Sequence, residues 1–190
     1  MQNETAGHLQ AMFLPALLVL LTACVPASAP SASRAEPADG GGSPPAEGWR
    51  TAELRDVRSG EALRINDLVG RLVVVEPMAI WCTNCRIQQN EVREALARLE
   101  SEDIVYIGLD VDPNETQPDL ARYADERGYT WHFAVAAREL ARSLAEAFGD
   151  QVLSPPSTPM IVIAPDGQAE VTFGIDSAAE LEADFSARLR

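Results

Sequence analysis

Short apolar runs alternate with amphipathic stretches along most of the sequence. Continuous runs rich in β-branched residues are typical of strands that are covered on both faces, and they occur at 72–75, 104–109 and 160–164. Apolar residues recur at helical spacing in four segments, which are 83–100, 120–127, 139–148 and 177–189. Shorter alternating stretches predict a hairpin around 56–60 and further strands at 131–135 and 169–173.

The order of these segments predicts the fold class. A βαβ unit comes first, an inserted helix and strand follow, and a ββα unit ends the chain. Gly128 and Gly149 are expected to end two of the helices, and Ser177 is expected to cap the last one. We therefore expect an α/β fold in which a central mixed sheet is flanked by helices on both faces, with an N-terminal hairpin.

The N-terminal segment has the pattern of a targeting signal. Its apolar run at 11–21 is shorter than the roughly 20 residues that a relaxed membrane span needs. The sequence Leu21-Thr22-Ala23-Cys24 directly after it resembles a bacterial lipobox, in which the Cys is lipidated. We expect a lipoprotein signal peptide at 1–23 and lipidation of Cys24; the alternative is an uncleaved hydrophobic anchor with an incidental Cys.

Composition separates a tether from a folded domain. Residues 24–48 consist largely of Pro, Ala, Ser and Gly, which cannot bury enough apolar area to offset the entropy of ordering. We expect a disordered tether at 24–48 and one domain at 49–190. The net charge of -14 and the absence of Lys exclude nucleic acid as a partner, because such a surface repels phosphates.

The motif Trp81-Cys82-Thr83-Asn84-Cys85 carries the predicted chemistry. Two thiols with this spacing at the first turn of a helix can form a small disulfide ring. The helix N-terminus stabilises a thiolate, so Cys82 is expected to be the exposed nucleophile. Cys85, one turn further on and facing the sheet, is expected to be the shielded resolving thiol.

The motif and its context resemble the thioredoxin superfamily, and most closely its membrane-tethered TlpA-like (ResA-like) thiol-disulfide oxidoreductases. The similarity rests on the lead-in at 68–70, the strand that runs into Trp81-Cys82, the insertion after Leu109, and Thr158-Pro159 followed by Gly167. It implies a thioredoxin-like fold and disulfide exchange with protein cysteines outside the cytoplasm. It also implies that the protein donates electrons to its partners as a reductant, as in cytochrome c maturation.

The resemblance assigns roles to three further residues. By similarity, Pro159 is a cis proline beside the disulfide, Thr158 presents its backbone to an extended substrate, and Trp81 packs over the disulfide. The alternative for Pro159 is an ordinary proline at the start of a strand. Some TlpA-like proteins have an acidic residue at the helix position that Gln88 occupies here. Because this chain has Gln, the role of that acid is not carried over.

Glu76 interrupts an apolar strand six residues before Cys82. Thioredoxins place a buried acid at this offset, and desolvation of such a carboxyl group would raise its pKa so that it could deprotonate Cys85 through a water molecule. The alternative is that Glu76 marks a strand end that reaches solvent next to Pro77.

Other functions compete with disulfide exchange. A copper metallochaperone would use Cys82 and Cys85, with His132 as a further ligand, but related carriers space their cysteines by three residues rather than two. A peroxiredoxin-type peroxidase needs a Thr before its reactive Cys, where Ile80-Trp81 stands. The segment 110–121 begins like a calcium-binding loop, but it lacks most of the ligands that such a loop needs.

The expected protein is therefore a lipid-anchored oxidoreductase on the periplasmic or outer face of a bacterial membrane. Its redox centre is the Cys82–Cys85 disulfide, with no other cofactor and no metal. Its expected partners are protein thiols and disulfides, together with a membrane thiol reductant, and we expect a monomer.

Overall fold

The computed structural model describes residues 47–190. The predicted signal peptide, the lipidation of Cys24 and nearly all of the tether lie outside this range. None of the helices within 47–190 is both long and apolar enough to cross a membrane. The described elements are, in chain order, α1 (Gly48–Thr51), β1 (Leu54–Arg55), β2 (Ala62–Leu63), η1 (Ile65–Leu68), β3 (Leu72–Met78), α2 (Thr83–Leu99), β4 (Ile104–Asp110), α3 (Gln117–Arg127), β5 (His132–Val135), α4 (Arg138–Phe148), η2 (Asp150–Leu153), η3 (Pro155–Ser157), β6 (Met160–Ile163), β7 (Ala169–Thr172) and α5 (Ala178–Arg188).

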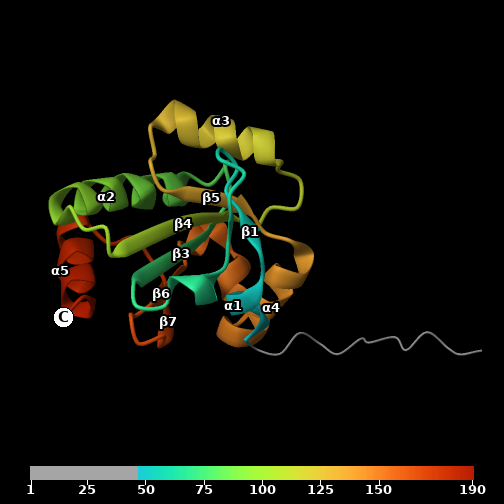
Figure 1. Ribbon diagram of the computed structural model, residues 1–190. Helices are drawn as coiled ribbons and strands as arrows, with labels where there is room; N and C mark the ends of the chain where they lie inside the picture. The colour runs from blue at the N-terminus through green and yellow to red at the C-terminus, as the bar shows by residue number, and fades with distance from the viewer. Residues whose placement is uncertain (1–46) are drawn as a thin grey trace, which may run out of the picture. The chain divides into compact units, whose positions relative to one another are not determined.

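The central sheet is mixed, as predicted. Its strand order is β5-β4-β3-β6-β7, and β1 and β2 form a separate antiparallel hairpin (Figure 1). Strand β3 lies in the middle, parallel to β4 and antiparallel to β6. All seven residues of β3 are buried, so the β-branched run does form a strand that is covered on both faces.

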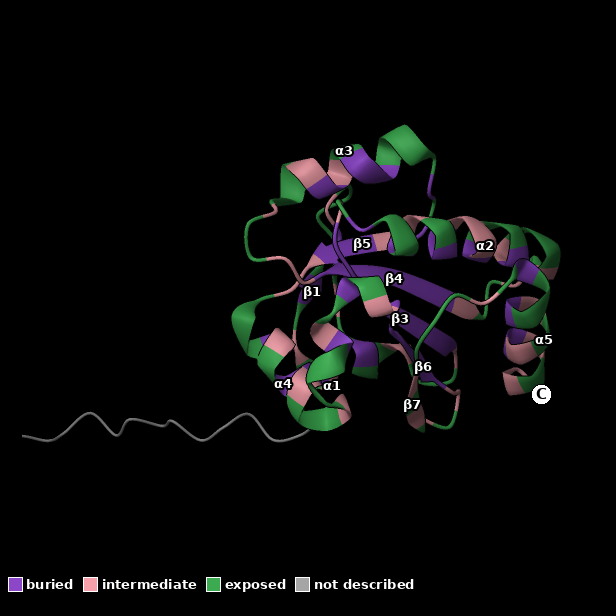
Figure 2. Ribbon diagram, turned by 180° about the vertical axis from the view of Figure 1, so that it is seen from behind, coloured by how far each residue is buried: buried purple, intermediate pink, exposed green. Residues whose placement is uncertain are grey.

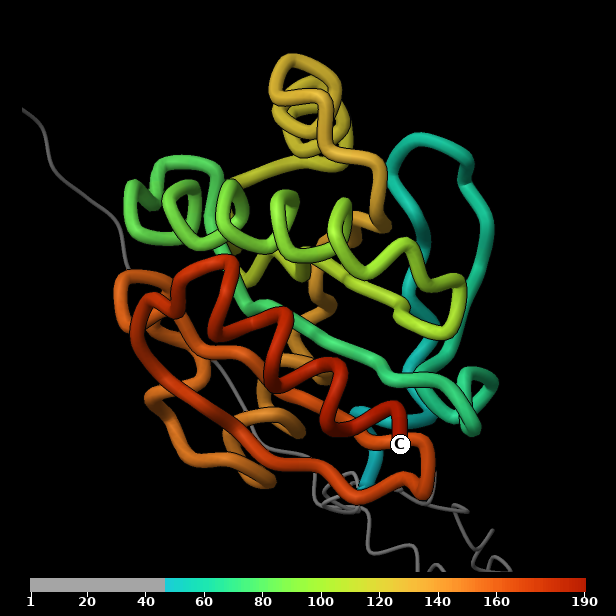
Figure 3. The backbone as a smooth tube through the Cα atoms, turned by 90° about the vertical axis from the view of Figure 1, so that its left-hand side faces the viewer, coloured from blue at the N-terminus to red at the C-terminus, as the bar shows by residue number. Residues whose placement is uncertain are grey.

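Side chains that alternate along the strands form two hydrophobic cores, one on each face of the sheet. Strands β3 and β4 are buried along almost their whole length (Figure 2). Val74 and Met78 point to the face covered by α2, α3 and α5, which we call the α2 face. Val73 and Val75 point to the opposite face, where they pack with residues of α1 and α4. Helices α2 and α5 lie side by side over the α2 face (Figure 3).

The structure differs from the sequence prediction at a few element ends. The chain forms the short helix α1 before the hairpin, and Trp49 of this helix is buried against Phe148, with ring centroids 5.1 Å apart. Helix α3 begins earlier than expected because the Thr116 side chain accepts a hydrogen bond from the backbone N–H of Asp119. The 3-10 turns η2 and η3 were also not predicted. The capping role of Ser177 is confirmed.

Gly108 allows a close approach of an aromatic ring on the α2 face. In the register of the sheet, Glu76 pairs with Gly108, which in turn pairs with Phe133. A Cβ atom at residue 108 would lie 2.5 Å from Cε1 of Phe133. Glycine therefore lets the Phe133 ring cover the backbone of β4, next to the strand that carries Glu76.

Candidate functional site

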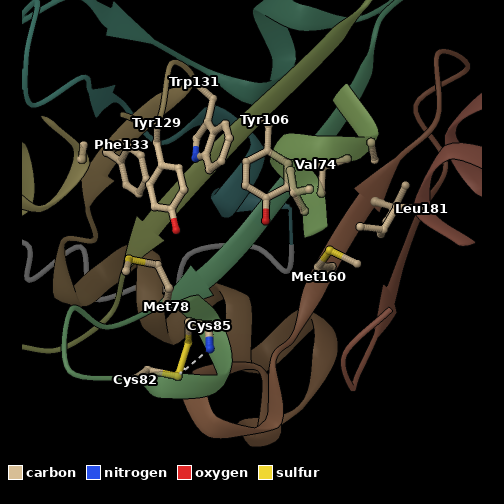
Figure 4. Close-up of a cluster of buried hydrophobic side chains, with 14 of the residues drawn as sticks. Val74, Met78, Cys82, Cys85, Tyr106, Tyr129, Trp131, Phe133, Met160 and Leu181 are labelled. Atoms are coloured by element: carbon tan, nitrogen blue, oxygen red, sulfur yellow. Dashed lines mark hydrogen bonds between the residues drawn. A yellow bond between two sulfur atoms is a disulfide. The ribbon is translucent and has the colours of Figure 1, made fainter. Parts of the chain in front are cut away.

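The cysteine pair lies where β3 leads into α2. Cys82 is the N-cap of α2, and its Sγ accepts a hydrogen bond of 3.1 Å from the backbone N–H of Cys85 (Figure 4). The two residues form a disulfide, with their Cα atoms 5.3 Å apart. The free N–H groups of the first helical turn and the helix dipole favour negative charge at the Cys82 sulfur once the bond is reduced.

The prediction that Cys82 is exposed is wrong for this oxidised form, in which Cys82 is 1% exposed and Cys85 is 0% exposed. The turn η3 packs against α2 and brings its backbone next to Cys85. The Asn84 side chain donates a hydrogen bond of 2.8 Å to the carbonyl of Pro156. The carbonyl oxygen of Pro155 lies 3.3 Å from Cys85 Sγ and is placed to accept a hydrogen bond from the reduced thiol.

The expected cis peptide before Pro159 is not found, because every peptide bond in 47–190 is trans. Thr158 instead has a left-handed backbone, with φ 45° and ψ 61°, and this turns the chain from η3 into β6. The Thr158 side chain is buried, and its backbone N–H donates to the carbonyl of Pro155. Pro155, which the sequence analysis did not single out, makes the contact with the cysteine sulfur.

Glu76 is buried, as predicted, and does not reach solvent at a strand end. Its Oε2 accepts hydrogen bonds of 2.8 Å from Gln89 Nε2 and from the Tyr106 hydroxyl group, whereas Oε1 has no partner. Burial raises the pKa of Glu76 to about 7, even though both hydrogen bonds favour the carboxylate. The carboxyl group therefore titrates near neutral pH. Gln89 was missed, although it lies four residues after Cys85 and thus on the same side of α2.

The segment 110–116, which we call the acidic loop, holds the residues that precede Cys82. Trp81 is 56% exposed, and its indole Nε1 donates a hydrogen bond of 2.7 Å to Asp112. The backbone N–H of Ile80 donates to Glu115 Oε2 at 2.8 Å. From the sequence this loop was recognisable only as an incomplete calcium site, and its contacts with the active-site segment were not predicted.

Two other residues named from the sequence lie elsewhere. His132 is paired in register with Ile107 and contacts Asp56 Oδ2 through Nδ1 at 3.2 Å. Gln88 accepts a hydrogen bond from the backbone N–H of Asp176 and so links α2 to the segment before α5. Within 47–190, no group of three or more His, Cys, Asp or Glu residues is arranged to hold a metal ion.

Comparison with known proteins identifies the fold. No protein-family model matches the sequence, and a search of curated proteins found no match. A thioredoxin-family thiol:disulfide interchange protein of Chlorobium tepidum TLS is 21% identical, with a TM-score of 0.63 over 74% of this chain and 94% of its own. A secreted disulfide oxidoreductase of Mycobacterium tuberculosis is 13% identical, with a TM-score of 0.58 over 73% and 97%.

A third solved structure is BsSco, a member of the Sco family of cytochrome c oxidase assembly proteins in which a disulfide switch is described. It is 13% identical, with a TM-score of 0.59 over 73% of this chain and 91% of its own. At these identities the similarity concerns the backbone arrangement. This similarity shows that the domain has the thioredoxin fold.

Proposed function

We propose that this protein is a thiol-disulfide oxidoreductase that exchanges disulfides with cysteines of extracytoplasmic proteins. The observation that carries the proposal is the Cys82–Cys85 disulfide, closed across the first turn of α2. A disulfide in this position joins two thiols of unequal surroundings, and such a pair can pass two electrons to or from a partner.

The proposed exchange has two steps. In the reduced protein, the Cys82 thiolate attacks a partner disulfide, forms a mixed disulfide and releases one partner sulfur as a thiolate. Cys85, as a thiolate, then attacks the Cys82 sulfur, which closes the internal disulfide and releases the second partner thiolate. The pair loses two electrons and the partner disulfide gains them, while two protons pass to the partner or to solvent.

Glu76 is placed on the α2 face, beneath the helix that carries both cysteines. Its link to α2 through Gln89, its unpaired Oε1 and its pKa near neutral suit a group that accepts the Cys85 proton through a water molecule. Such a transfer would favour the second step, because only a deprotonated Cys85 can resolve the mixed disulfide.

The direction of electron flow and the location are part of the same proposal. The resemblance of the motifs to TlpA-like proteins supports a reductant that receives its electrons from a membrane thiol reductant. The lipobox-like sequence before Cys24 supports a lipid anchor, and the composition of 24–48 supports a tether that lets the monomeric domain reach its partners.

The test uses the full chain in its oxidised and reduced forms. The proposal expects reversible closing and opening of the Cys82–Cys85 bond in glutathione buffers, and reduction of insulin disulfides by the reduced protein. The equilibrium constant with glutathione also gives the reduction potential, which distinguishes a reductant from an oxidant. Failure to cycle reversibly, or reduced protein that does not act on insulin, would refute the proposal.

The copper metallochaperone is the alternative. For this function the two cysteine sulfurs would be available as copper ligands. His132, the third expected ligand, contacts Asp56 and is not part of the site. Titration of the reduced full chain with Cu(I), beside the insulin assay, separates the two functions. Tight copper binding without insulin reduction would favour the metallochaperone.

A further inference from the structure

The acidic loop, residues 110–116, forms three hydrogen bonds with the segment that leads into Cys82. The backbone N–H of Val111 donates to the carbonyl of Met78 at 3.0 Å. The Ile80 N–H donates to Glu115, and the Trp81 indole donates to Asp112. Two of the three bonds therefore depend on carboxyl groups, and they hold the two residues directly before Cys82.

Behind these contacts lies a pair of carboxyl groups. Asp110 is 0% exposed; its Oδ1 accepts the backbone N–H of Asp112 at 2.9 Å, whereas its Oδ2 has no donor. A side-chain contact with Glu115 is among the causes that raise the pKa of Asp110. Two carboxylates cannot hydrogen-bond to each other, so this contact requires that one of the two groups carry a proton.

We infer that Asp110 and Glu115 share one proton, and that this pair positions Ile80 and Trp81 so that Cys82 lies correctly at the start of α2. The inference rests on the proposed disulfide exchange and adds two positioning residues to it. While the proton is present, Glu115 stays beside Asp110 and accepts the Ile80 N–H. When the proton is lost, two adjacent negative charges repel each other, and the Ile80 contact is weakened.

The surroundings of the pair favour the protonated state. On the neighbouring strands, Asp110 lies between Met78 of β3 and Val135 of β5, which are both apolar. Burial raises the pKa of Asp110 to about 8, with further contributions from Glu115 and from the nearby charge of Asp112. Toward solvent, Glu115 shares a hollow with charged residues of α3, which are Asp119, Arg122, Glu126 and Arg127.

Loss of the proton should also affect chemistry at Cys82. An added negative charge behind the active-site segment disfavours a second negative charge on the Cys82 sulfur. The reactivity of Cys82 is therefore expected to depend on the protonation of a pair that does not touch the sulfur.

The inference can be tested without any redox reaction, by NMR of the oxidised full chain. The indole resonance of Trp81, assigned with Trp81→Phe, and the amide resonance of Ile80 should shift together with an apparent pKa near that of Asp110, about 8. Asp110→Asn removes the buried titrating group, so the shift near this pH should disappear. Glu115→Gln keeps a hydrogen bond between the side chains but removes the second carboxyl group, so the shift should move to lower pH. Asp119→Asn is the matched control, because it removes an exposed acid facing the same hollow and should leave the shift unchanged.

A second measurement follows the alkylation rate of Cys82 in the reduced protein against pH. The inference expects a step near the pKa of Asp110 in the natural sequence and in Asp119→Asn, loss of this step in Asp110→Asn, and its movement to lower pH in Glu115→Gln. A resonance shift that persists in both amide variants, or one that Asp119→Asn also removes, would overturn the inference. Because the NMR readout needs no activity, failure of the proposed function in the insulin assay would be recognised separately.

Discussion

For individual residues, Cys82 and Cys85 differ mainly in their position on α2. Cys82 is the N-cap and lies beside the exposed Trp81, whereas Cys85 lies one turn inside, next to the carbonyl of Pro155. We expect reduced Cys85→Ala to form a stable mixed disulfide on Cys82 with a disulfide peptide, because no second thiol can release it. Mass spectrometry of the adduct measures this. An equal yield of adduct with Cys82→Ala would show that the roles are assigned wrongly.

Glu76 leads to a prediction about the second step of exchange. Glu76→Gln should slow release of the mixed disulfide by up to about a hundredfold and leave the first attack nearly unchanged, because general base catalysis acts only on Cys85. In the natural sequence, release should accelerate as the pH rises through about 7, the pKa of Glu76, and this dependence should be absent in the variant. Stopped-flow fluorescence separates the two steps. Equal slowing of both would argue against the proton transfer.

The site could be predicted from sequence only as far as its residues are close in the chain. The C-x-x-C spacing and the six-residue offset of Glu76 are local features, and both led to positions that the structure confirms as the disulfide and as a buried acid. The contacts of Glu115 and Asp112 with the segment before Cys82 join residues that lie far apart in the chain, and they depend on how two loops meet at the edge of the sheet. No pattern of spacing within either loop indicates such a contact.

Among the secondary structure elements, the strands and long helices were predictable because each has its own hydrophobic period. The turn η3 has none, since Pro155, Pro156 and Ser157 are set by contacts with α2 rather than by local preference. The same turn explains why the cis proline and the exposed Cys82 were predicted wrongly. The left-handed Thr158 redirects the chain, and the preceding turn packs against α2 beside Cys85.

The packing of η3 against α2 predicts how access to the disulfide is controlled. Asn84→Ala removes the hydrogen bond to the carbonyl of Pro156, and such bonds contribute roughly 1 kcal/mol. Reduction of the disulfide by dithiothreitol should therefore become about fivefold faster, because the covering turn opens more readily. Asn84→Asp is a useful second variant, since it also lacks the donor. A reduction rate unchanged in both variants would mean that the turn does not limit access.

Over the whole domain, three buried acids make stability depend on pH in opposite directions. Burial raises the pKa of Glu76 from 4.5 to about 7, and the pKa of Asp110 is raised as well. For Asp56, burial acts upward, but backbone N–H groups of Ser59, Arg58 and Phe133 outweigh it and lower the pKa to about 2. A raised pKa gives stability that is lost as the pH rises, and a lowered one gives stability that is lost as the pH falls.

The free energy of unfolding of the oxidised chain should therefore be highest near pH 4 to 5, close to the unfolded pKa values of 3.8 for Asp56 and 4.5 for Glu76. Between pH 4.5 and about 7, Glu76 ionises in the unfolded chain but stays largely protonated in the folded chain. This difference alone should lower the free energy of unfolding by roughly 3 kcal/mol, because a tenfold change in proton affinity corresponds to about 1.4 kcal/mol. Urea denaturation at a series of pH values measures the total decline, and Glu76→Gln should reduce it over the same range, leaving the part that comes from Asp110. Glu139→Gln, which removes an exposed acid, is the control and should leave the decline in place. A decline of equal size in Glu76→Gln would show that the buried carboxyl group at residue 76 is not its source.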